Sequence, residues 1–180
     1  MPSGKKKITY TTESQSFGIK SEPLIRRTFA VNFPEYKVRN PRGYEMYRRI
    51  DKPYLTATLD GLLVEKETNR KGILEIKTCD IRRKADLEEW ANQIPQKYFD
   101  QIIHYLMVMN DCEYVRLVAQ LKFYDWDAPQ ENKIAKLETR FFYIERSEVE
   151  ESIKNLEIVE THFWEYNVQG KHIPNVKISF

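Results

Sequence analysis

The stretch Leu59–Thr78 decides the fold, and it reads LDGLLVEKETNRKGILEIKT. The stretch begins within a run of apolar and β-branched residues, Tyr54–Glu65. It ends within a second run of this kind, Gly72–Cys79. Residues of this kind favour strands, whereas the polar segment between the runs, Thr68–Gly72, has the composition of a turn. The stretch therefore predicts a β-hairpin.

Charged side chains alternate with apolar ones in the second strand of this hairpin. Glu75 and Lys77 share one face, because successive side chains of a strand point to opposite faces. A hairpin centred at residues 67–68 would place Asp60 directly opposite Glu75. A turn centred at residues 69–70 would displace Asp60 by about four positions, unless a bulge corrected the register. The sequence permits both registers.

The chemistry of this pair depends on the first register. Asp60, Glu75 and the main-chain carbonyl of Ile76 would then supply hard oxygen ligands of the kind that Mg²⁺ or Mn²⁺ binds. Lys77 would lie beside them, where it could orient or deprotonate a water molecule. A divalent cation stabilises negative charge on a phosphodiester, so the pattern indicates a hydrolytic nuclease. The alternative is an ordinary surface ion pair beside an Asp-Gly turn.

A helical pattern runs from Pro95 to about Asn110 and carries one apolar stripe. On the flank of this stripe, Tyr98, Gln101 and Tyr105 lie within an arc of about 60°. Gln101 could hydrogen-bond a water molecule, a metal ligand or a phosphate on the neighbouring strand. It could equally be satisfied by solvent.

The remaining pattern places this hairpin and helix in a mixed α/β or α+β fold, with a central mixed sheet flanked by helices. A first helix over Ser16–Ala30 is expected, or one that begins at Glu22 with Ser21 as its cap, since Pro23 favours a helix start. The other expected elements are strands at Tyr36–Arg39, Tyr44–Arg48, Tyr114–Tyr124 and Leu137–Glu145, and a closing helix from an N-cap at Ser147 to about Tyr166.

Composition limits the classes of protein to which the chain can belong. Its 180 residues are 41% apolar, which is enough for one core, and we expect a single domain over residues 16–180 after a flexible tail over residues 1–15. A mean hydropathy of −0.64 and the absence of a long apolar run argue against a membrane span. Cys79 and Cys112 form no Cys-x-x-Cys motif, and no signal peptide is evident, so we expect a reducing cytoplasm.

Four ordered motifs resemble those of the YqaJ-like phage recombination nucleases, the group of lambda exonuclease within the PD-(D/E)xK superfamily. The resemblance covers roughly Phe17 to Val118, and position 59 holds Leu where the superfamily often has Pro. It implies a restriction-endonuclease-like core. The motifs are Gly18-x-x-x-Glu22-Pro23, Leu59-Asp60-Gly61, Leu74-Glu75-Ile76-Lys77-Thr78 and Tyr98-x-x-Gln101-x-x-His104-Tyr105.

This resemblance also implies roles for the residues singled out above. Asp60 and Glu75 would bind Mg²⁺ or Mn²⁺ together with the carbonyl of Ile76. Lys77 would be the catalytic lysine. The cofactor would thus be a divalent cation, and the catalytic centre would lie on the hairpin.

Two further residues would assist from helices, Gln101 from the long helix and Glu22 from the first one. Members of the family degrade or cut duplex DNA during recombination, often beside a single-strand annealing protein, and some form trimeric rings. The resemblance implies a phage or prophage enzyme in a bacterial cytoplasm, with exonuclease activity favoured over endonuclease activity. The alternative is a catalytically inactive DNA-binding subunit of a recombination complex that keeps the nuclease fold.

Overall fold

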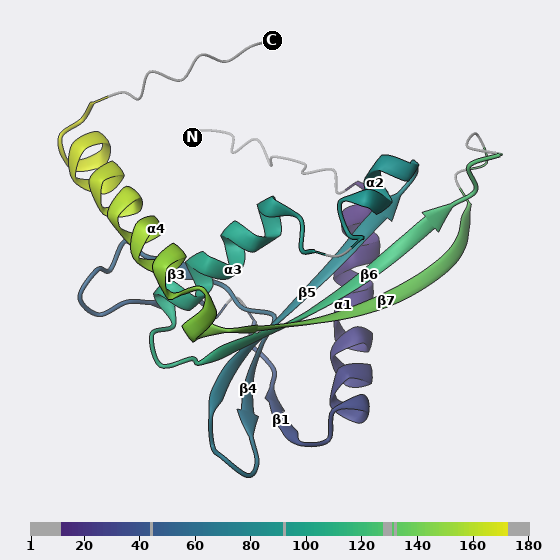
Figure 1. The fold of residues 1–180 in the computed structure, drawn as a ribbon, viewed down its shortest axis with the longest axis horizontal. Coiled ribbons are helices and arrows are strands. Elements are labelled where there is room, and N and C mark those ends of the chain that lie inside the picture. Colours follow the sequence, from purple (N-terminus) through teal and green to yellow (C-terminus); the bar gives the residue numbers. More distant parts are fainter. Residues whose placement is uncertain (1–11, 44, 92, 128–130, 132, 173–180) are drawn as a thin grey trace, which may run out of the picture.

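A five-stranded mixed sheet forms the centre of the protein (Figure 1). Its strands lie in the order β1-β4-β5-β6-β7, and the central pair β5–β6 is parallel while the other pairs are antiparallel. The computed structural model describes residues 12–43, 45–91, 93–127, 131 and 133–172. The strands of the sheet are β1 (Tyr36–Arg39), β4 (Gly61–Glu65), β5 (Lys71–Ile81), β6 (Tyr114–Tyr124) and β7 (Ile134–Glu145).

Helices flank this sheet, and a small second sheet lies beside it. The long β-rich runs of the sequence make the central strands, and the mixed sheet flanked by helices agrees with the predicted fold class. The helices are α1 (Glu13–Asn32), α2 (Lys84–Glu88), α3 (Gln96–Val108) and α4 (Glu150–His162), with a 3₁₀ turn η2 (Arg146–Glu148) and a π-helical extension η3 (Phe163–Gln169). The second sheet pairs β2 (Tyr47–Arg48) with β3 (Thr56–Ala57).

The hairpin adopts the first of the two registers that the sequence permits. Gly61 pairs with Leu74, so Asp60, the residue before β4, comes opposite Glu75. Asn69 takes a left-handed conformation with φ of 59° and closes the turn, which Asn tolerates better than most residues. The hairpin is therefore centred at residues 67–68.

Two apolar clusters lie on opposite faces of the sheet. On one face, Ile25 and Phe29 of α1 pack against Val118 and its neighbours. On the other face, α3 buries Ile102 and Leu106 against the sheet, and both side chains are inaccessible to solvent. On each face of the sheet a helix buries apolar surface, and this burial is the main source of stability for such a sheet. Figure 1 shows α1 running behind β5, β6 and β7.

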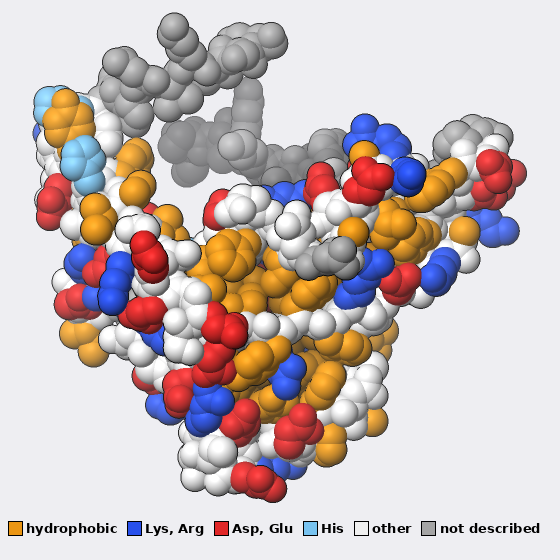
Figure 2. Space-filling model, viewed as in Figure 1, with side chains coloured by type: hydrophobic (Ala, Val, Ile, Leu, Met, Phe, Trp, Pro, Cys, Tyr) orange, Lys and Arg blue, Asp and Glu red, His pale blue; other side chains and the backbone are white. Residues whose placement is uncertain are grey.

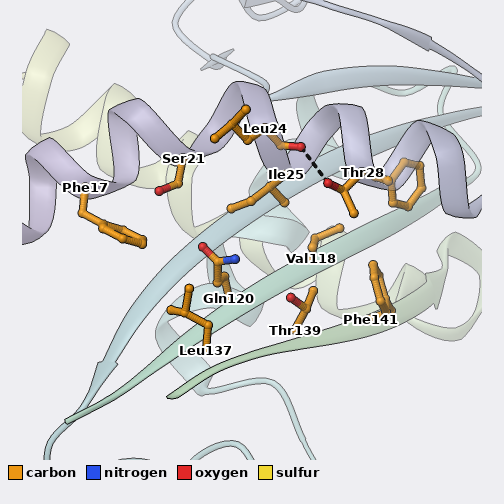
Figure 3. Close-up of a pocket in the computed structure, with 11 residues that line it drawn as sticks. Phe17, Ser21, Leu24, Ile25, Thr28, Val118, Gln120, Leu137, Thr139 and Phe141 are labelled. Carbon is orange, nitrogen blue, oxygen red and sulfur yellow. Dashed lines mark hydrogen bonds between the residues drawn. The ribbon is translucent and has the colours of Figure 1, made fainter. Parts of the chain in front are cut away.

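A cavity of about 290 Å³ lies between α1 and the β6–β7 part of the sheet (Figure 3). Leu24 and Ile25 of α1 line it together with Phe141 of β7. Two other residues of α1, Glu22 and Arg26, are absent from this lining. The helix thus presents an apolar face to β6 and β7 and a second, charged face elsewhere.

The first helix begins earlier than expected. It starts at Glu13, inside the stretch expected as a tail, and Thr12 and Gln15 form a capping box. Both expected starts, Ser16 and Glu22, are therefore wrong, and residues 1–11 lie outside the described part. Pro23 lies within the helix, because the cap and the burial of residues beyond it outweigh the hydrogen bond that a proline removes.

Other boundaries also differ from the predictions. The run Tyr54–Glu65 does not form one strand but splits into β3 and β4. The strand expected from Tyr44 is reduced to β2, and Tyr44 itself lies outside the described residues. The segment around Ser147 forms η2, because Arg146 donates to main-chain carbonyls of Leu106 and Cys112 at 2.8 and 3.2 Å and anchors a tight turn there.

The end of the chain shows further differences. The expected N-cap at Ser147 is wrong, since α4 begins at Glu150 without a side-chain cap. The helix ends at His162 and continues as η3 to Gln169. The short helix α2 was not predicted, because its charged sequence has no apolar period. Within the described ranges, every helix is too short or too polar to cross a bilayer.

Candidate active site

The candidate site lies at the edge of β5, where its pairing with β4 stops. The last paired residue of β5 on this edge is Leu74. Beyond it, Oδ2 of Asp60 accepts a hydrogen bond of 2.7 Å from the main-chain N–H of Ile76. The Asp60 side chain thus occupies the place that a neighbouring strand would otherwise take. Because the N–H and C=O of one strand residue point to the same side, the Ile76 carbonyl also faces Asp60.

Glu75 is the most buried acidic group of this edge, with 1% of its surface exposed. Its Oε1 lies 2.5 Å from Nζ of Lys77. Its Oε2 is buried and has no hydrogen-bond partner among the described residues. Burial and, to a lesser extent, the charge of Asp60 together raise the pKa of Glu75 to about 8, although Lys77 opposes the rise. A buried carboxylate oxygen without a partner is costly, so this position suits a cation.

Asp60 has a similar but milder environment. Burial raises its pKa, the Ile76 N–H opposes that rise, and the charge of Glu22 adds to it. Glu22 lies on α1, and its charge acts on Asp60 from that helix. Three carboxylates from α1, from the break before β4 and from β5 therefore converge, and the charge of Glu22 contributes to the raised pKa of both Asp60 and Glu75.

Arg26 connects α1 to this group of carboxylates. Its guanidinium forms an ion pair with Glu22, and its Nε donates a hydrogen bond of 2.8 Å to the main-chain oxygen of Asp60. Only 9% of Arg26 is exposed. Arg26 was not among the residues predicted for the site, although its position four residues after Glu22 on one helix is the spacing of an ion pair.

The helix α3 contributes a polar pair. Nε2 of Gln101 lies 2.5 Å from the hydroxyl of Tyr105 and donates to it. Burial raises the pKa of Tyr105 to about 12, and the charge of Glu75 contributes to the rise. Tyr105 therefore lies close enough to Glu75 for the two side chains to interact electrostatically. Gln101 is linked to the site by its hydrogen bond with Tyr105. The spacing of four residues between Gln101 and Tyr105 on one helix could have indicated this contact.

Lys77 is held between the acids and an aromatic ring. Besides its contact with Glu75, its Nζ lies 5.5 Å from the centre of the Tyr98 ring. The hydroxyl of Tyr98 in turn lies 3.3 Å from Sγ of Cys79 on the same face of β5. These contacts restrict the lysine to the open edge of β5.

His104, which lies three residues after Gln101 on α3, connects parts of the fold. Its Nδ1 lies 2.8 Å from Oε1 of Glu160 on α4, and its Nε2 lies 2.8 Å from the main-chain oxygen of Thr56. Hydrogen bonding to Glu160 raises the pKa of His104. The ring therefore joins α3, α4 and β3.

The donor set of the site fits a divalent cation that keeps several water molecules. Asp60, Glu75 and the Ile76 carbonyl present hard oxygen atoms, and one buried carboxylate oxygen of Glu75 has no hydrogen-bond partner in the part of the chain that the structure describes. Among the described residues, no cluster of three or more His, Cys, Asp or Glu side chains is arranged to hold a metal ion. A metal at this edge would thus rely on two carboxylates, one carbonyl and solvent.

Comparison with known proteins adds one family. A family model described as the YqaJ-like viral recombinase domain matches residues 1–112, which is more than half of the chain. The matched part contains all the residues predicted for the site, from Glu22 to Gln101. A search of curated proteins found no match.

Proposed function

The chain belongs to the YqaJ-like viral recombinase domain family, and from this premise we propose that it is a metal-dependent deoxyribonuclease of phage-type recombination. Its substrate would be duplex DNA, and its cofactor Mg²⁺ or Mn²⁺. The observation that carries the proposal is the buried Oε2 of Glu75 beside Asp60 and Lys77, which has no hydrogen-bond partner within the described residues.

The carboxylates and the carbonyl would bind the cation. A bound Mg²⁺ or Mn²⁺ would stabilise the negative charge that develops on the phosphodiester during hydrolysis. Asp60 is already oriented for this role by the Ile76 N–H, and burial keeps Glu75 in a low-dielectric environment where attraction to a cation is strong.

Lys77 would orient the water molecule that attacks phosphorus. Its Nζ is fixed by Oε1 of Glu75, so it can donate to a water or to a phosphate oxygen at the open edge. In hydrolysis the water oxygen bonds to phosphorus, the bond to the leaving sugar oxygen breaks, and that oxygen takes up a proton from water. Tyr105 and Gln101 line the α3 side, and Glu22 adds an acidic group from α1.

The distribution of charge on the viewed face indicates how DNA would be held. Figure 2 shows Lys and Arg side chains interspersed with Asp and Glu rather than gathered into one basic surface. The whole chain carries a formal charge of only +2. We therefore propose that the acidic site and its cation, rather than a broad basic surface on this face, select the scissile phosphate.

The proposal extends to the setting of the reaction. We propose that the enzyme is an exonuclease that acts in a bacterial cytoplasm during phage or prophage recombination, beside a single-strand annealing protein and as a homo-oligomer.

A DNA cleavage assay tests the proposed function. The purified protein would be incubated with linear duplex bearing a 5′-phosphate or a 5′-hydroxyl, and with closed circular DNA, in Mg²⁺, Mn²⁺ or EDTA. We expect linear DNA to be degraded in either metal and preserved in EDTA, and circular DNA to stay intact. Duplex binding without cleavage in both metals would contradict the proposal and would indicate the inactive DNA-binding subunit instead.

A further inference from the structure

Arg26 is the buried cation of α1 that contacts two acidic residues of the site at once. It pairs with the Glu22 side chain and donates to the main-chain oxygen of Asp60 at 2.8 Å. Its side chain is only 10% exposed, whereas that of Glu22 is 36% exposed. A buried guanidinium must be paired and hydrogen-bonded, and both partners of Arg26 belong to the acidic group.

Asp60 depends on contacts of this kind because it lies outside the paired strands. It falls in the break between β3 and β4. The Ile76 N–H fixes its side chain from the sheet, and Arg26 fixes its main chain from the helix. The two contacts together determine where the carboxylate of Asp60 lies relative to Glu75.

Glu22 depends on Arg26 in a different way. It lies one helical turn before Arg26, and its partly exposed side chain could otherwise extend into solvent. The guanidinium donates in two directions from one rigid plane, with Nε toward Asp60 and Nη2 toward Glu22. A lysine has a single nitrogen on a flexible stem and cannot hold both partners in the same geometry.

We propose that Arg26 is a positioning residue that joins Glu22 of α1 to the main chain of Asp60 and so holds the carboxylates ready for a divalent cation. This inference rests on the proposed function, since it assumes that the acidic group binds a metal. It assigns to α1 a role beyond the contribution of Glu22, because the helix also sets the position of Asp60.

Charge alone predicts the opposite effect, which makes the inference testable. Arg26 is a positive charge beside a cation site, so simple Coulomb repulsion predicts that its removal would strengthen metal binding. A positioning role predicts that its removal would weaken binding, because the carboxylates would lose their arrangement. Residues that orient metal ligands typically contribute a factor of about 10 to 100 in affinity.

Titration calorimetry with MnCl₂ separates the two effects. We expect Arg26→Gln to weaken Mn²⁺ binding about 10-fold relative to the wild type. Arg27→Gln is the matched control, since it removes the same charge from an exposed position of the same helix, and it should bind as the wild type does. Binding by Arg26→Gln that equals or exceeds that of the wild type would overturn the inference.

The variant Arg26→Lys covers the case in which Arg26→Gln fails to fold. It keeps the charge but loses the two-directional contact, so we expect its affinity for Mn²⁺ to fall between those of the wild type and Arg26→Gln. Thermal unfolding of each variant checks that the protein tested is folded. Wild-type affinity in folded Arg26→Lys, when Arg26→Gln does not fold, would overturn the inference.

DNA cleavage as a function of Mg²⁺ concentration adds a kinetic test. A positioning role predicts that Arg26→Gln needs more Mg²⁺ for half-maximal cleavage and regains much of its maximal rate when Mg²⁺ is saturating. An unchanged Mg²⁺ requirement overturns the inference while leaving the proposed nuclease intact. Conversely, a wild type that binds Mn²⁺ more tightly than Arg26→Gln but cleaves no DNA overturns the nuclease and supports the role of Arg26 in cation binding.

Discussion

The two halves of β5 differ in what lies along their edge. In the first half, Lys71–Leu74, the strand pairs with β4 on one side and β6 on the other. In the second half, Glu75–Ile81, pairing with β6 continues, but on the other edge the Asp60 side chain replaces a strand at Ile76. The candidate site therefore arises where a continuous strand loses one neighbouring strand while keeping the other.

This loss of a partner gives the second half its chemistry. Main-chain groups that would pair with a strand become free to bind a side chain or a ligand. Continuous pairing with the parallel neighbour β6 supports this half of the strand, so Glu75 and Lys77 lie on a rigid element. The first half contributes stability, and the second half contributes the candidate active site.

The largest effect expected from this comparison separates two lysines of the same strand. Lys77→Ala should lower metal-dependent DNA cleavage by at least about 100-fold, because it removes the only cation in contact with Glu75 among the described residues. Lys71→Ala is the matched control in the first half, where the side chain is exposed and pairs with Asp111. Equal cleavage rates for the two variants, measured on linear duplex DNA, would contradict the assignment of the active site to the second half of β5.

The next effect is on stability and belongs to the first half. Ile73 is fully buried between β4 and β6, so Ile73→Ala should lower the free energy of unfolding by about 2–5 kcal/mol. Urea unfolding followed by circular dichroism measures this change. At a temperature where the variant is folded, its cleavage rate should fall far less than that of Lys77→Ala. A stability equal to that of the wild type would contradict the assignment of this half to the core.

A smaller change tests how closely the first half is packed. A Cβ at Gly72 would lie 2.1 Å from the ring of Tyr114, its partner on β6, so the ring or the strand would have to move. We expect Gly72→Ala to cost about 1–3 kcal/mol of unfolding free energy. An unchanged urea midpoint would show that the strands approach less closely than described.

The smallest effect lies away from both halves, at the contact between α3 and α4. The pKa of His104 is raised by Glu160, so their pairing stabilises the fold fully below the ordinary histidine pKa of about 6.5 and loses that contribution as pH rises through the folded-state pKa. Glu160→Gln should therefore lose about 1 kcal/mol or less near pH 6, and the difference from the wild type should shrink at higher pH.

Unfolding free energies of wild type and Glu160→Gln across pH 6 to 9 would measure this. A difference that grows as pH rises would have the wrong sign for a raised pKa and would refute the pairing. Cleavage of DNA should follow the folded fraction in this variant, because His104 lies outside the acidic group.

Much of the fold could be predicted from the sequence where local pattern and tertiary environment agree. The strands Tyr36–Arg39 and Tyr114–Tyr124 were predicted with their observed bounds. In the first strand, exposed charged residues alternate with Tyr36 and Val38, which suits an edge strand, whereas most of the second strand is buried in the centre of the sheet. Both expected starts of α1 were wrong. The apolar pattern suggested Ser16 and Pro23 suggested Glu22, whereas the capping box at Thr12 starts the helix at Glu13.

The site could be predicted only in part, for a physical reason. Glu75 and Lys77 follow from strand alternation, but whether Asp60 meets them depended on the turn, which permitted two registers. The break that frees the edge of β5 lies inside a run that otherwise suits a continuous strand, and its one local signal, Asp60-Gly61, indicates a turn without showing that the edge of β5 is left open. Arg26 was not predicted as a site residue because its contact with the main-chain oxygen of Asp60 forms only in the tertiary structure, whereas its local pairing with Glu22 alone does not distinguish it from an ordinary helix ion pair.

The central claim is that a divalent cation binds at the open edge of β5 between Asp60 and Glu75. Anomalous X-ray scattering from crystals of the protein soaked in MnCl₂ tests it most directly. We predict one strong peak in contact with Oε2 of Glu75 and with the Asp60 carboxylate, and its loss in Glu75→Gln. A strong peak elsewhere with none at this edge, or a peak that survives unchanged in Glu75→Gln, would contradict the claim.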